Sequence, residues 1–87
     1  MNWQEVRSLY PHQWVILEAF DAYTEGSRRV VDELSVYGGF DGFYDAWDAH
    51  KKYADGKREI YVYHTFNEEL KIGIMDRFFR RVEENAD

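Results

Sequence analysis

Two extended segments that meet at a glycine limit the fold of this chain most strongly. Residues 13–24 and 28–37 are rich in aromatic and β-branched side chains at alternating positions, and Glu25-Gly26-Ser27-Arg28 joins them. Glycine at the first central position of a two-residue loop suits a type II′ turn, whose twist matches that of a hairpin. The sequence therefore predicts an antiparallel hairpin that turns at Gly26-Ser27. A turn at Glu25-Gly26 is the alternative, with less suitable residues.

The alternation predicts that both faces of the hairpin are apolar near its open end. Either turn position gives the same two faces, because the two registers differ by an even shift. The register decides only whether Asp21 faces Asp32 or Glu18 faces Glu33. We expect the open end to be covered on both sides. One face carries Val15, Leu17, Ala19, Tyr23, Val30, Leu34 and Val36, and the other carries Trp14, Ile16, Phe20, Val31 and Tyr37.

One helix is predicted before the hairpin and one after it. Asn2 and Glu5 have the spacing of a capping box, and Pro11 ends this first short helix. Asp41 is placed to cap a second helix over residues 42–54, whose apolar stripe predicts packing on a sheet. The stripe of the first helix is Val6, Leu9 and Tyr10, and that of the second is Phe43, Ala46, Trp47, His50, Tyr53 and Ala54.

Two further strands complete the predicted fold. Gly38-Gly39 is expected to break the second strand, residues 59–65 form a third, and residues 70–74 alternate as a fourth. Residues 76–82 fit either a helix or a strand, and the polar residues 83–87 are expected to fray. Short loops predict antiparallel pairs. The chain thus reads as a single α+β domain over residues 1–87, in which the main helix packs on one face of a four-stranded antiparallel sheet.

Composition excludes several classes of site and partner. The 87 residues include no cysteine, which removes disulfides, thiolate metal sites and cysteine nucleophiles. A net charge of −6 makes a nucleic-acid partner an unfavourable hypothesis, because such binding depends on neutralising phosphates. No run approaches the length of about 18 apolar residues that a membrane helix needs, and the first residues lack a signal-peptide pattern. We expect a cytoplasmic protein with no membrane partner.

Aromatic residues make up 18% of the chain, and a core this small cannot enclose all of them. Exposed aromatic rings are typical of protein interfaces, because they offer large apolar area at low entropic cost. Tyr23, Arg28 and Arg29 near the predicted turn are candidate contact residues. The sequence favours a non-enzymatic interaction module that self-associates, or binds another protein, through the hairpin of residues 13–37 or an aromatic face.

A small-molecule binder or weak enzyme is the alternative function. Its site would be a pocket between the helix of residues 42–54 and the sheet, near Trp14, Trp47, Tyr63 and His64. His64 at a strand end has the chemistry of a general base, but no nucleophile motif accompanies it, so no catalytic residue is assigned. No two histidines have a metal-ligand spacing, and no cofactor fingerprint is present, so neither a metal nor a cofactor is predicted.

Two short motifs resemble a known pattern. Residues 10–15 read Tyr-Pro-x-x-Trp-Val, and residues 64–70 read His-Thr-x-x-x-Glu-Leu. Together with the segment of residues 58–63 they are similar to a family of short bacterial proteins with no assigned activity. The similarity covers roughly residues 9–75. It implies a bacterial cytoplasmic setting and an α+β fold, and it transfers no catalytic residue.

Overall fold

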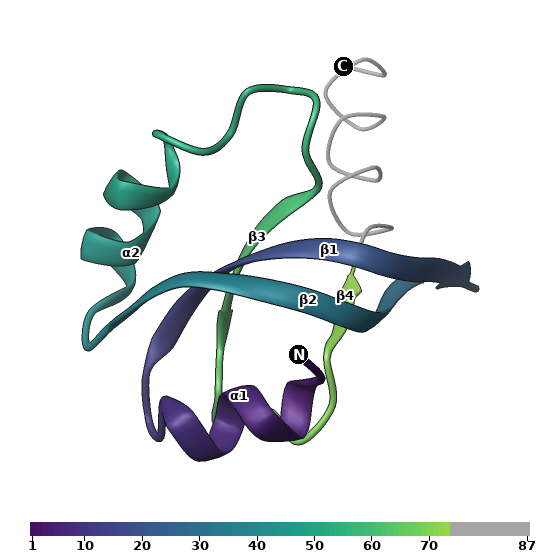
Figure 1. Ribbon diagram of the computed structural model, residues 1–87, viewed down its shortest axis with the longest axis horizontal. Coiled ribbons are helices and arrows are strands. Elements are labelled where there is room, and N and C mark those ends of the chain that lie inside the picture. The colour runs from purple at the N-terminus through teal and green to yellow at the C-terminus, as the bar shows by residue number, and fades with distance from the viewer. Residues whose placement is uncertain (74–87) are drawn as a thin grey trace, which may run out of the picture.

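The hairpin is the centre of the structure, a computed structural model that describes residues 1–73. The elements follow the order that the sequence predicts, and the sheet is antiparallel throughout, so the α+β class is confirmed (Figure 1). The predictions for residues 76–82 and 83–87 lie outside the described residues. The elements are α1 (Trp3–Leu9), β1 (Trp14–Glu25), β2 (Arg28–Phe40), α2 (Phe43–His50), β3 (Ile60–His64) and β4 (Lys71–Gly73).

The turn lies where the sequence places it. Glu25 pairs with Arg28, which leaves Gly26 and Ser27 as the two loop residues. Gly26 has a φ of 60°, and Ser27 has no positive φ. A positive φ at the first central position alone is the pattern of a type II′ turn. The alternative turn at Glu25-Gly26 is therefore wrong.

Irregular pairing between the strands overturns the prediction of two unbroken faces. The register shifts skip Phe20 on β1 and both Asp32 and Tyr37 on β2. Each skipped residue is a bulge that moves the following side chains to the other side of the strand. Val31 consequently packs in the core cluster that contains Leu34, not on the opposite face. Neither predicted acid pair forms, because Asp21 lies opposite Glu33.

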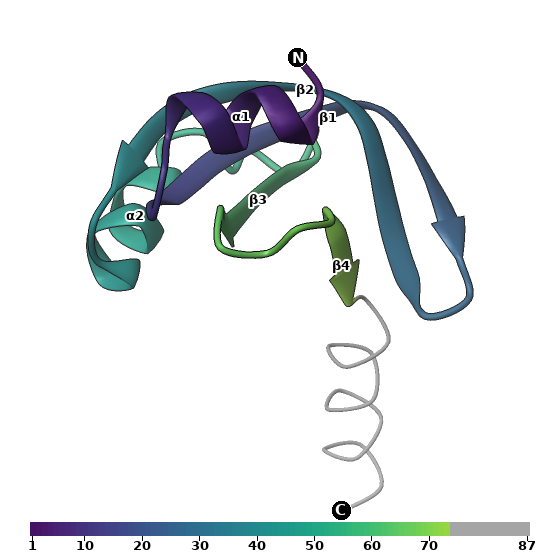
Figure 2. The ribbon, with the colours of Figure 1, turned by 90° about the horizontal axis from the view of Figure 1, so that it is seen from below.

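The third and fourth strands do not form a hairpin with each other. The sheet order is β3-β1-β2-β4, so these two strands occupy opposite edges although only residues 65–70 separate them. Bending of the β1–β2 ribbon makes this possible, because it arches over β3 and β4 and brings the two edges together (Figure 2). The hydroxyl of Tyr63 on β3 donates to the carbonyl of Lys71 on β4 at 3.3 Å.

Each face of the sheet near the open end carries one helix. Val15 and Leu17 point to one face and pack in a cluster with Trp3 and Val6 of α1. The intervening Ile16 is also fully buried but lies outside that cluster, on the face that α2 covers. The prediction that both sides are covered is confirmed.

The first helix is anchored to the loop that precedes β4. The capping box of Asn2 and Glu5 is present. The indole Nε1 of Trp3 donates to the carbonyl of Asn67 at 2.8 Å, and Nε of Arg7 donates to the carbonyl of Thr65 at 3.0 Å. Side chains of α1 therefore satisfy backbone acceptors of the loop. The predicted stripe is partly wrong, because Trp3 and Val6 face inward whereas Leu9 is exposed.

Two boundaries after the hairpin differ from their predictions. The strand continues through Gly38 and Gly39, which pair with Ile16 and Val15. Glycine serves close approach at Gly39, because a Cβ there would lie 2.7 Å from a ring carbon of Tyr10. The second helix begins after Gly42 without a side-chain cap, so Asp41 is not its N-cap, and it ends at His50 instead of continuing through residue 54.

Candidate functional site

The start of β1 brings two of the predicted site residues together. Trp14 pairs with His64 of β3, and their rings lie edge to face with centroids 5.0 Å apart. The Trp14 indole also meets the ring of Phe43, at the first position of α2, at 4.9 Å. Edge-to-face contacts at this spacing are favourable for aromatic pairs. Trp14 therefore joins the sheet to α2.

Aromatic side chains continue outward along α2. Positions 43 and 47 are one helical turn apart, and the rings of Phe43 and Trp47 are stacked at 5.7 Å. Tyr44 contacts Phe43 at 5.6 Å. These side chains stay in solvent, with Phe43 37%, Trp47 45% and Tyr44 84% exposed. Phe43, Tyr44 and Trp47, with Trp14 beneath them, form a continuous patch that we call the aromatic surface.

The side chain by which α2 packs on the sheet is small, and this explains why so much of the helix is exposed. Ala46 is the one fully buried residue of this helix, because it packs directly against the sheet. Within the stripe predicted from the sequence, the methyl group of Ala46 covers the sheet. The larger aromatic rings of the stripe lie at the edge of this contact or in solvent. Trp47 contacts His50 at 4.1 Å, and Nδ1 of His50 meets the carbonyl of Trp47.

The imidazole of His64 has a structural role at the end of β3. Its Nδ1 accepts a hydrogen bond from the backbone N–H of Phe66 at 2.9 Å. The backbone carbonyl of His64 accepts a hydrogen bond from the side-chain amide of Asn67 at 2.9 Å. These bonds shape the turn that follows β3, and they leave Nε2 as the ring nitrogen without such a bond. Because Nδ1 accepts a hydrogen bond, the neutral imidazole carries its proton on Nε2, so this nitrogen is a donor and the arrangement does not favour a general base.

Tyr63 lies away from the aromatic surface. It pairs with Val15 and contacts Trp3 of α1 at a ring distance of 5.7 Å, so it belongs to the other face of the sheet. Bending of the ribbon brings it close to Arg28, and both line a polar cavity of about 280 Å³. The structure thus divides the residues proposed for a pocket near His64, since Trp14, Trp47 and His64 share one side and Tyr63 lies on the other.

Arg29, a predicted contact residue at the turn end, is engaged within the molecule. Its Nε and Nη2 donate to the two carboxylate oxygens of Glu59 at 2.8 and 3.1 Å. The hydroxyl of Tyr61 donates to the same carboxylate at 2.7 Å. The Arg29 hydrogen bonds, followed by the one from Tyr61, hold the pKa of Glu59 below its ordinary value. Tyr23 and Arg28 remain exposed at this end.

The segment after α2 is tied to the hairpin by a second polar group. Tyr37 stacks on Tyr53 with ring centroids 4.4 Å apart, and its hydroxyl donates to the carboxylate of Glu18. This hydrogen bond is the main cause of a raised pKa for Tyr37. Arg58 donates to the Tyr37 hydroxyl at 3.4 Å and pairs with Asp55 at 3.2 Å. These contacts attach the segment that follows α2 to the hairpin.

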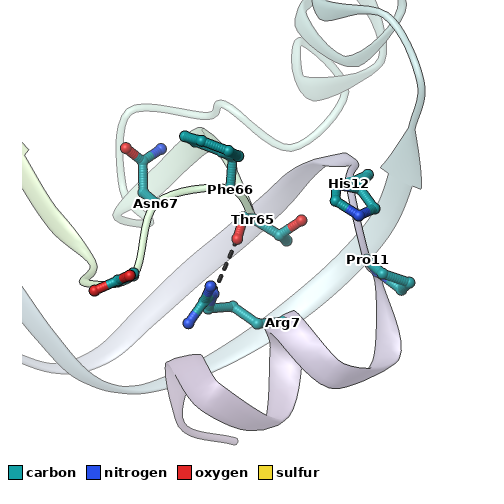
Figure 3. A pocket seen from close by; sticks show the side chains of 7 residues that line it. Arg7, Pro11, His12, Thr65, Phe66 and Asn67 are labelled. Carbon is teal, nitrogen blue, oxygen red and sulfur yellow. Dashed lines mark hydrogen bonds between the residues drawn. The ribbon is translucent and has the colours of Figure 1, made fainter.

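Two regions were not anticipated from the sequence. Tyr44 was outside the predicted stripe, although its position next to Phe43 is a signal of an aromatic patch that extends beyond the sheet. A cavity of about 620 Å³ lies between the end of α1 and the turn after β3, and Arg7, His12 and the exposed ring of Phe66 are among the side chains that line it (Figure 3). No local motif marks this cavity, because its walls are more than 50 residues apart in sequence. Neither cavity is lined by residues of α2.

Within residues 1–73, no group of three or more histidine, aspartate or glutamate side chains is arranged to hold a metal ion. Over the same residues, no helix has the length and apolar character to cross a membrane. No protein-family model, curated protein sequence or solved structure matches the chain. The resemblance to short bacterial proteins therefore stays a prediction, and function is argued from the geometry alone.

Proposed function

We propose that this protein is a self-associating interaction module and that the aromatic surface on α2 is its contact face. The observation that carries the proposal is the continuous exposed patch of Phe43, Tyr44 and Trp47. Tyrosine and tryptophan are the residues that most often dominate binding energy at protein interfaces. The patch rests on the rigid contact of Phe43 with Trp14, so little side-chain freedom is lost on binding.

Charge along α2 supports a second copy of the chain as the partner. Asp41 and Asp45 lie in the first part of the segment and Lys52 follows the helix, while Lys51 already pairs with Asp48 of the same chain at 3.7 Å. Two copies related by a two-fold axis, with α2 antiparallel to its mate, place the acidic part of each against the basic part of the other. A parallel arrangement would oppose like charges.

The size of the patch sets the expected affinity. Eight helical residues span about 12 Å, so the contact lies near the small end of specific interfaces. We expect a dimer with a dissociation constant in the micromolar range or weaker. Sedimentation velocity over a concentration series measures this constant directly.

Two serine variants distinguish the candidate faces. Tyr44→Ser removes the most exposed ring of the aromatic surface and is expected to weaken the dimer by more than about tenfold. Phe20→Ser is the matched control, because Phe20 is 61% exposed but lies on the hairpin. Loss of the dimer in Phe20→Ser with no change in Tyr44→Ser would move the interface to the hairpin and overturn the assignment.

Charge exchange tests the antiparallel arrangement. Asp45→Lys and Lys52→Glu should each weaken the dimer by about three- to tenfold, because both contacts between positions 45 and 52 across the axis become repulsive. A mixture of the two variants should recover association, because opposite charges again face each other in the mixed dimer. Failure of the mixture to recover would contradict this geometry.

A further inference from the structure

The cavity beside α1 is separate from the aromatic surface and has features of a ligand site. Its volume of about 620 Å³ falls within the range of small-molecule pockets, which is about 300–1,000 Å³. Arg7 of α1 and Phe66 of the loop after β3 both line it, with Thr65 between them, and Pro11 and His12 form one end (Figure 3). Asn67 and Glu68 complete its rim.

Arg7 supplies a positive charge that forms no ion pair with a carboxylate within residues 1–73. Its Nε donates to the Thr65 carbonyl at 3.0 Å, and its Nη1 donates to Oε1 of Gln4 at 3.1 Å. Both acceptors are neutral. In the part of the chain that the structure describes, Arg29 and Arg58 each have a carboxylate partner, whereas Arg7 has none. The Arg7 guanidinium is half-buried, and neutral acceptors hold it in place in a chain of net charge −6. It can therefore form a charge-assisted hydrogen bond with an anion.

His12 adds a second hydrogen-bond donor at the same cavity. It is the one described residue other than glycine with a positive φ, at 55°. A side chain in this conformation costs free energy, and such residues concentrate at functional sites. The strained backbone turns the chain between α1 and β1 and places the imidazole at the end of the cavity (Figure 3).

The remaining wall is apolar, and hydrogen bonds hold the backbone that carries it. The Phe66 ring is 76% exposed, and its backbone N–H is held by Nδ1 of His64 at 2.9 Å. Beneath it, Thr65 is buried, and its hydroxyl donates to the Tyr10 carbonyl at 2.8 Å while it accepts from the Gln13 N–H at 3.1 Å. The floor is thus internally satisfied, and the ligand would meet one apolar ring and the Arg7 guanidinium.

We propose that this cavity binds a small monoanionic carboxylate that bears an aromatic or aliphatic group. The carboxylate accepts hydrogen bonds from Arg7 and His12, and the apolar group packs on Phe66 and Pro11. A second negative charge on the ligand is disfavoured, because Arg7 can balance only one charge and Glu68 on the rim repels another. Charge therefore selects a carboxylate over a phosphate.

The test titrates phenylacetate, acetate and inorganic phosphate separately into ¹⁵N-labelled protein and follows the backbone amide resonances. Phenylacetate should give saturable shifts centred on residues 65–67, with acetate and phosphate each weaker by about tenfold or more. Arg7→Gln should weaken phenylacetate binding by about tenfold or more, because the charged donor is lost. Lys57→Gln, which removes an exposed positive charge from a residue that lines neither cavity, should leave the affinity unchanged.

Two further variants keep the test decisive if Arg7→Gln disturbs the fold. His12→Asn retains a residue that tolerates a positive φ, and Phe66→Ser changes an exposed ring, so both should keep the amide spectrum of the folded protein while they weaken phenylacetate binding. Absence of saturable shifts with phenylacetate, or equal weakening by Lys57→Gln, would overturn the site. Phosphate binding that is tighter than phenylacetate binding would overturn the assignment of a carboxylate. Tyr44→Ser should bind phenylacetate normally, which separates this site from the dimer face.

Discussion

The two ends of the β1–β2 hairpin are stabilised by different interactions. At the open end Val15, Ile16 and Leu17 are all fully buried, because α1 covers one face and α2 the other. At the turn end no helix of the described residues packs on the ribbon. Three residues of β4 pair with residues 28–30 there, and the ion pair of Arg29 with Glu59 supplies a polar tie.

Element lengths explain this difference. A strand of 12 residues spans about 40 Å, whereas helices of seven and eight residues span about 10–12 Å each. The two helices therefore cover only one end of the ribbon, whichever face they occupy. Strand pairing with β4, burial of Val31 and Ile72 in the core cluster, and the ion pair of Arg29 with Glu59 hold the other end.

The largest expected effect compares apolar burial at the two ends. Leu17→Ala removes a fully buried side chain from the core cluster and should lower the free energy of unfolding by about 2–5 kcal/mol. Phe20→Ala, three residues along the same strand, removes a ring that is mostly in solvent and should change it by less than about 0.5 kcal/mol. Urea denaturation followed by circular dichroism measures both. Similar losses in the two variants would contradict the division of the hairpin.

A smaller effect is expected where the open end depends on a buried hydroxyl. Thr65→Val keeps the side-chain shape but leaves the Tyr10 carbonyl and the Gln13 N–H without their partner. Each buried unsatisfied group costs about 1–3 kcal/mol, so the loss should exceed 1 kcal/mol. Thr65→Ser retains the hydroxyl and should lose less. Equal stability of the valine and serine variants, measured by the same denaturation, would show that this hydroxyl contributes little.

The sequence predicted the fold class and the turn because both follow from local rules. Glycine at position 26 determines the turn type, and alternation identifies the strands. The bulges at Phe20, Asp32 and Tyr37 follow from the bending of the whole ribbon, which no local pattern records. The pairing partners of β3 and β4 were missed for the same reason, since a short loop normally joins neighbouring strands.

The close approach at Gly39 offers a third test of the open end. Gly39→Ala would place a Cβ against the side-chain oxygen of Gln13 and 2.7 Å from the Tyr10 ring, so both side chains must move, and we expect a loss of about 1–3 kcal/mol. Gly38→Ala is the matched control, because its nearest neighbour would lie at 3.4 Å, an ordinary contact. Alanine there should be neutral or slightly stabilising. Thermal unfolding of both variants makes the comparison, and a larger loss at position 38 would contradict it.

The candidate sites were predictable only in part. Trp14, Trp47 and His64 were proposed together and do lie on one side of the sheet, because alternation and helical spacing set the direction of each side chain. The exposure of the α2 rings was not predictable, since an apolar stripe does not show how closely the helix packs against the sheet. The cavity at Arg7 depends on contact between α1 and residues 65–68, which arises from the tertiary fold.

The smallest effect concerns the turn end and depends on pH. Because Arg29 holds the pKa of Glu59 below its ordinary value of 4.5, the ion pair contributes stability that is fully present above that value. This contribution is lost as the pH falls through the lower pKa of the folded state. Glu59→Gln should therefore be less stable than the parent at pH 7, by less than the Leu17→Ala loss, and the difference should shrink toward pH 3. Urea midpoints of both proteins across this range measure it.

Leu17→Ala provides the control for that pH dependence, because the side chain removed carries no charge. The difference between Leu17→Ala and the parent should stay nearly constant from pH 7 to pH 3, whereas the Glu59→Gln difference declines. Tyr61→Phe, which removes the hydroxyl that donates to the Glu59 carboxylate, should show a weaker form of the same decline. A Glu59→Gln difference that does not change with pH would mean that charge plays no part in holding the turn end. In that case the pairing with β4 alone would distinguish the turn end from the open end.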